Sequence, residues 1–138
     1  MTFDFGVLAS IRSVLMRSAR ARDLGVKQVY LSPPQNQDFP AIFLEIEEIW
    51  TSMIPMPGDV QARIKVKASC WAQTGKGRDS MAIANTLRQE VEGNRVALED
   101  GKTGVFRCTN SITELPHPTR PSTVQHFFDV SIRSAVAA

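Results

Sequence analysis

The stretch from Val60 to Ala72 alternates apolar and polar residues along almost its whole length. Because successive side chains of a β-strand point to opposite faces of the sheet, this alternation predicts a strand with one buried face. The other face carries Arg63, Lys65 and Lys67, which need water or a partner around them. The sequence therefore predicts a sheet that is covered on one side only.

Two other segments have apolar residues at helical spacing, which predicts a helix over about residues 5–22 and another over about 78–91. Gly25 and Gly93 follow these segments and are the expected helix stops. Further strands are predicted over about residues 26–31, 41–51, 105–115 and 123–136. The order α-β-β-β-α-β-β indicates an α+β fold, in which two helices pack on one face of a mainly antiparallel sheet. A length of 138 residues suits a single domain over residues 1–138.

The predicted strand over residues 41–51 has an acidic polar face. Its apolar face consists of Ile42, Leu44, Ile46 and Trp50. If this strand and residues 60–71 form an antiparallel hairpin, Glu45 falls opposite Lys65 and Glu47 falls opposite Arg63. Opposite charges would then support the register that the apolar faces determine.

Two proline-rich loops have compositions that are unusual for solvent-exposed turns. The hairpin connection 52–59 is apolar where a polar tip is expected, so it either packs on its own core or forms an exposed contact arm. The second loop spans residues 116–122. The candidate subunit or docking interface consists of Met53, Ile54, Pro55, Met56, Pro57, Pro116, His117, Pro118, Arg120 and Pro121.

The net charge of +2 does not select a partner. A candidate basic face is formed by Arg12, Arg17, Arg20, Arg63, Lys65 and Lys67. It supports an alternative function as a small nucleic-acid-binding module. A solvated helix face is the favoured explanation of the helix arginines, and Glu45 and Glu47 would neutralise the strand cations.

No motif for catalysis, a cofactor or a metal ion is recognisable. The loop Thr74–Asp79 lies between a strand and a helix, but it lacks the Gly-Lys-Ser/Thr end of a phosphate-binding loop and reads as a tight turn. His126 and the two cysteines, Cys70 and Cys108, fall on different strands and are expected to pack in the core. A disulfide between these cysteines requires neighbouring strands, and two cysteines without a pairing motif favour a reduced chain. We therefore expect a structural or binding protein without enzymatic activity; an enzyme would need a pocket that gathers titratable groups around His126.

No apolar run approaches the roughly 20 residues that span a bilayer, and the chain start has no signal-peptide pattern. The sequence thus predicts a cytoplasmic protein that does not contact membranes.

The combination of segments resembles a known family. A helix and a strand lead to Pro40–Ile46, Ile64–Ala72 runs into a glycine-containing turn and a helix, and Phe127–Ile132 lies near the end. In this order and spacing the chain resembles the tail completion, or tail terminator, proteins of long-tailed bacteriophages and phage-like particles such as gene transfer agents.

The resemblance implies a small α+β domain without an active site or cofactor. Copies of such proteins join into a ring, commonly a hexamer, which ends tail tube growth and joins the tail to the head connector or stopper protein. The implied partners are therefore other copies of the chain, the tail tube protein and the connector, while DNA passes through the ring without specific recognition. The implied location is the virion, at the junction of head and tail, after assembly in the host cytoplasm.

Overall fold

The computed structural model describes residues 6–26, 28–31, 40–51, 60–72, 77–98, 101–114 and 122–134. The elements are α1 (Val7–Arg17), α2 (Ala19–Asp23), β1 (Val29–Tyr30), β2 (Ala41–Thr51), β3 (Val60–Ala72), α3 (Gly77–Val91), β4 (Arg95–Ala97), β5 (Lys102–Thr113) and β6 (Ser122–Ser134). All six strands form one sheet in the order β1-β2-β3-β6-β5-β4, and only β1 and β2 pair in parallel. The predicted α+β class is confirmed. The short strand β4 is an addition to the predicted order, and the predicted first helix is divided into α1 and α2.

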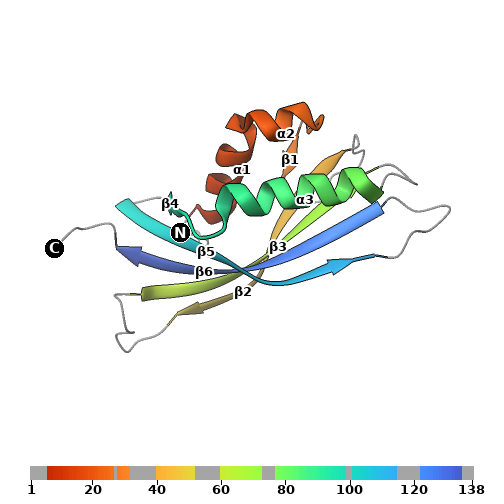
Figure 1. Ribbon diagram of the computed structural model, residues 1–138. Helices are drawn as coiled ribbons and strands as arrows, with labels where there is room; N and C mark the ends of the chain where they lie inside the picture. The colour runs from red at the N-terminus through yellow and green to blue at the C-terminus, as the bar shows by residue number, and fades with distance from the viewer. Residues whose placement is uncertain are drawn as a thin grey trace.

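The helices of the described chain lie together on one side of a strongly twisted sheet (Figure 1). The alternating residues of β3 that were predicted to be inward, from Ala62 to Cys70, are all buried. They pack with apolar residues of α1 and α3 and with Phe106 and Phe128 in one continuous core. The three cations Arg63, Lys65 and Lys67 therefore lie on the opposite, uncovered face.

The helix predicted over residues 5–22 is divided at Ser18, whose backbone is extended (φ −73°, ψ 122°). The Ser18 hydroxyl accepts a hydrogen bond from the Ala21 amide and donates one to Glu90 on α3. Serine at such a position satisfies a free amide of the new helix, so the interruption is stabilised locally and through α3. Both predicted helix stops, Gly25 and Gly93, have positive φ angles of 86° and 76°.

The register predicted for the β2–β3 hairpin was wrong. Glu45 lies opposite Lys67 rather than Lys65. A β-bulge between Ile46 and Glu48 then inserts Glu47 as an extra residue, so Glu48 in place of Glu47 carries the next charge and lies opposite Lys65. The bulge also moves Trp50 from the predicted apolar face to the uncovered face. A single inserted residue reverses the facing of every later side chain in the strand.

Within the described residues, no helix combines the length and the apolar character needed to cross a membrane.

Candidate functional site

A row of alternating charges crosses the uncovered face of the sheet. The row consists of four residues that pair across neighbouring strands. They are Glu48 on β2, Lys65 on β3, Asp129 on β6 and Arg107 on β5. Lys65 Nζ is 3.5 Å from a Glu48 carboxylate oxygen, and a parallel contact one row away joins Lys67 to Glu45 at 3.4 Å. Each cation of these two rows thus lies opposite a carboxylate, which reduces the net field of this part of the face.

A shallow hollow of about 220 Å³ lies over this row. It is lined by Glu48, Trp50, Arg63, Lys65 and Asp129. The hollow is smaller than the ~300–1,000 Å³ typical of small-molecule sites, so its size suits a side chain of a partner protein better than a metabolite.

Exposed apolar side chains gather on two strands that flank this face. Of the six large apolar side chains that the described chain exposes, three lie on β2 and β5. They are Ile49, Trp50 and Ile112, with exposed fractions of 37%, 48% and 45%. Exposed apolar residues on sheet margins are typical of surfaces that pair with another chain.

A second hollow of about 490 Å³ separates α1 from β4. Small residues of α1, including Ala9, Ser10 and Ser13, form one wall, and Arg95 to Leu98 form the other. Ser10 Oγ donates a hydrogen bond to the Ala97 carbonyl and links the two walls at one point. One side of β4 pairs with β5, and this hollow lies along the strand on the helical side.

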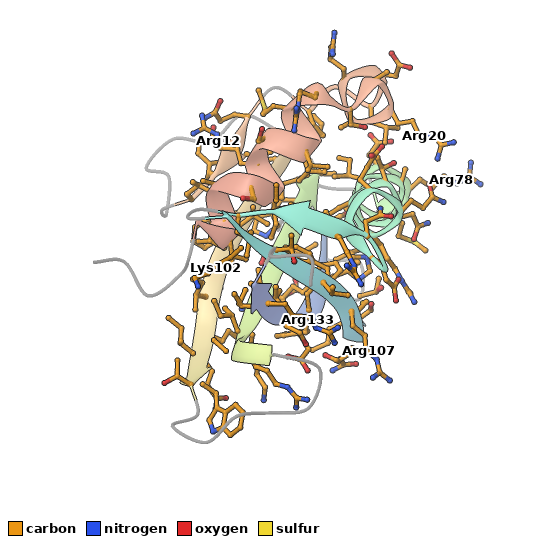
Figure 2. The ribbon with its side chains drawn as sticks, turned by 90° about the vertical axis from the view of Figure 1, so that its left-hand side faces the viewer. Arg12, Arg20, Arg78, Lys102, Arg107 and Arg133 are labelled. Atoms are coloured by element: carbon orange, nitrogen blue, oxygen red, sulfur yellow. The ribbon has the colours of Figure 1, made fainter. Side chains whose placement is uncertain are left out.

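The predicted basic face is not a single surface in the structure. Arg12, Arg17 and Arg20 are exposed on the helical layer, whereas the cations of β3 occupy the uncovered side of the sheet. Figure 2 shows Arg12 and Arg20 on the helices, and it shows Arg107 and Arg133 on the part of the sheet that lies away from the helices. The sheet separates the two groups, so they cannot contact one stretch of nucleic acid together.

One polar cluster that the sequence did not predict lies in the covered layer. His126 on β6 is buried, and its Nε2 donates to the Ala84 carbonyl of α3 over 3.0 Å. Because a carbonyl only accepts, Nε2 carries the proton of the neutral ring, and Nδ1 accepts from the Ser111 hydroxyl of β5 at 2.5 Å. Cys108 Sγ lies 4.0 Å from the same Nδ1.

The surroundings of His126 favour its neutral form. Burial lowers the pKa of His126 most strongly, and the charge of Arg88 lowers it further. The hydrogen bond to Ala84 and the charge of Glu92 raise the pKa in part. Both ring nitrogens are occupied by contacts that join α3, β5 and β6, so the geometry serves to hold these elements together.

The two cysteines are free. Cys70 on β3 lies opposite Val124 of β6, and Cys108 on β5 lies opposite Phe128 of the same strand. Strand β6 therefore lies between them, and two strand spacings of about 4.8 Å exceed the reach of a disulfide. Burial raises the pKa of the Cys70 thiol to about 12.

In the part of the chain that the structure describes, no group of three or more histidine, cysteine or acidic residues is arranged to hold a metal ion.

The loop residues predicted as an interface, from Met53 to Pro57 and from Pro116 to Pro121, lie outside the described residues. The exposed apolar residues of β2 and β5 were not predicted as a contact surface. Their signal in the sequence is weak, because isoleucine and tryptophan in a strand usually indicate burial.

Comparisons with known proteins identify a similar fold. No protein-family model matches the chain. No curated protein matches its sequence. A solved chain from the "Virion of native gene transfer agent (GTA) particle" aligns with a TM-score of 0.70 over 91% of this chain and 93% of that chain, at 12% identity. At this identity the likeness establishes that the two chains share a fold across nearly their full lengths.

Proposed function

We propose that this protein is a structural component of a phage-like particle, and that it acts as the tail terminator. Copies of the chain form a ring at the head-proximal end of the tail, with six subunits as in the family that the chain resembles. The ring ends growth of the tail tube and joins the tube to the head connector. DNA passes through its lumen without sequence recognition.

The observation that carries this proposal is the shared fold with a chain of a gene transfer agent virion over nine-tenths of both chains. The resemblance of the sequence segments to proteins of phage-like particles agrees with this shared fold. The shared fold does not itself distinguish the tail terminator from other virion proteins, so that role rests on the resemblance.

The surface chemistry supports the proposal. The sheet has one face without a covering helix among the described residues, and its margins expose Ile49, Trp50 and Ile112. A subunit of a ring needs two different contact patches, because each copy meets one neighbour on each side. The two sheet margins are two such patches on one molecule.

The proposal includes no catalytic role. The most reactive arrangement in the described chain is Ser111 with His126, and both ring nitrogens of His126 are engaged in structural hydrogen bonds. The group that orients the ring is the neutral Ala84 carbonyl, which does not stabilise an imidazolium as the carboxylate of a catalytic triad does, and Cys108 supplies no such carboxylate.

The test is removal of the gene from a strain that makes the particle, followed by electron microscopy. Loss of the terminator should leave heads without tails and tail tubes of irregular length, and expression of the chain in trans should restore joined particles. Joined particles with tails of normal length in the deletion strain would contradict the proposal. Light scattering of the purified chain with tail tubes tests direct binding to the tube end.

A further inference from the structure

At each edge of the sheet the outermost strand is short and covers only part of the strand beside it. The two-residue strand β1 covers β2 only at Ile42 and Phe43, so the rest of β2 has no strand beside it among the described residues. The three-residue strand β4 covers β5 from Thr103 to Val105, and an isolated bridge from Glu92 extends this covered part to Phe106. Among the described residues, each margin therefore has a short covered part and a longer uncovered part.

The covered parts lie at diagonally opposite corners of the sheet. One row of paired residues runs from Trp50 on β2 through β3, β6 and β5 to Arg95 on β4. A second row runs from Tyr30 on β1 through β2, β3 and β6 to Ile112 on β5. Each row is five strands wide, and the second row is displaced by one strand relative to the first.

This displacement allows a second copy to continue the sheet without a gap. Suppose that the second copy has the same orientation and that its paired rows continue those of the first. Its β2 then lies next to β4 of the first copy, and its β1 lies next to the uncovered part of β5. The strand directions make the β2–β4 contact parallel and the β1–β5 contact antiparallel, and both patterns are normal in sheets. The two short strands then occupy a single strand position, one above the other.

The residues at the row ends are chemically complementary. In this arrangement the exposed ring of Trp50 meets the exposed guanidinium of Arg95 from the next copy, a favourable cation–π pair. Glu48, two residues from Trp50 on the same face of β2, adds negative charge near the same arginine while its carboxylate contacts Lys65. At the other end Tyr30 meets Ile112, which is 45% exposed in the isolated chain.

The hollow between α1 and β4 leaves room along β4 for an approaching strand. Addition of a strand at a sheet edge satisfies backbone amides and carbonyls that otherwise bind water. On β4 the Ala97 carbonyl already accepts from Ser10 Oγ, so the added strand pairs with the rest of this edge. The side chains of α1 that face this hollow include the small residues Ala9 and Ser13, which occupy little of the space beside β4.

We infer that a second copy of this chain binds edge to edge, with the β1–β2 margin of one subunit against the β4–β5 margin of the next. The contact is head-to-tail, so each subunit uses one margin toward each neighbour, as a closed ring requires. This inference rests on the proposed function for its biological setting, and it adds to that function the surfaces that meet.

Disulfide cross-linking of the full chain tests the inference. In a Cys108→Ser background, one variant carries Trp50→Cys with Arg95→Cys, and another carries Tyr30→Cys with Ile112→Cys. The matched control carries Met16→Cys with Met81→Cys, because both methionines are exposed and lie away from the sheet margins. Each single substitution is also made, and all proteins are oxidised gently at high concentration, alone and with tail tubes.

Both double variants should lose monomer into a ladder of covalent dimers, trimers and larger species, while the single variants and the control should not. Light scattering of the unoxidised proteins reports assembly independently. Assembly without cross-linking above the control would overturn the edge contact and leave the proposed function standing. Covalent dimers from single variants would also overturn it, because they indicate a two-fold contact, as would a chain that stays monomeric under every condition. A ladder from a protein that does not bind tail tubes would support the edge contact and contradict the proposed function.

Discussion

The buried imidazole of His126 on β6 donates a hydrogen bond from Nε2 to the carbonyl oxygen of Ala84 on α3, across 3.0 Å. The other nitrogen of the same ring accepts from Ser111 on β5. One side chain therefore connects the helical layer to two strands of the sheet. The contact also makes the stability of this packing sensitive to protonation.

Stability should decrease as the pH falls below about 6.5, the ordinary pKa of histidine. Burial lowers the pKa of His126 in the folded chain, so the unfolded chain takes up the proton first as the solution becomes acidic. The unfolded state then binds more protons, and the free energy of unfolding falls with decreasing pH. Urea unfolding between about pH 5 and 8 measures this slope.

The variant His126→Gln should be less stable than the natural chain at neutral pH and should have a flatter pH profile above pH 5. Ser111→Ala is the control, because it removes one hydrogen bond and retains the titrating ring. Glu92 should not contribute to the slope between about pH 5 and 8, because the hydrogen bond from Arg88 lowers the pKa of Glu92 below the ordinary carboxylate value. A natural chain that is equally stable across this range would contradict the prediction.

Leu87→Ala should destabilise the fold by about 2–5 kcal/mol, because it removes a fully buried side chain and leaves a cavity. Met81→Ala is the matched control on the same helix. Met81 is 50% exposed, so its loss should change the free energy of unfolding by no more than about 0.5 kcal/mol. Chemical denaturation measures both, and equal effects at the two positions would be inconsistent with the packing of α3.

The folded chain should offer one reactive thiol, and the denatured chain should offer two. Cys70 is buried and its pKa is raised to about 12, so almost no thiolate forms at neutral pH. Cys108 is partly exposed. A colorimetric thiol titration distinguishes the two states, and Cys108→Ser should abolish the reaction of the folded protein. Rapid modification of Cys70 in the folded Cys108→Ser variant would argue against this burial.

The pair formed by Glu45 and Lys67 should show a coupling energy of about 0.2–1 kcal/mol in a double-mutant cycle of alanine variants. High salt should reduce it, because both side chains are partly exposed. The cycle between Glu45 and Lys65 is the control, since a simple hairpin register would pair these two residues and the observed register does not. Stronger coupling in the control cycle would contradict the observed register.

The sequence was informative about the faces of the long elements. The buried residues of β3 and the inward stripe of α3 follow from the direction of each side chain relative to its own backbone, which is a local property. The proposed interface was less predictable. The loops that the sequence singled out lie outside the described residues, and the exposed residues of β2 and β5 appear only when the strands have been placed in order.

From residue order alone, then, came the α+β class, the one-sided sheet and the boundaries of β2 and β3, because periodic burial leaves a periodic trace in the chain. Tertiary structure decided that β6 lies between β3 and β5, that a bulge after Ile46 moves Trp50 to the uncovered face, and that His126 meets Ala84. Several strands with equivalent apolar faces are interchangeable in sequence, and only simultaneous packing of all of them against the helices selects their order and register.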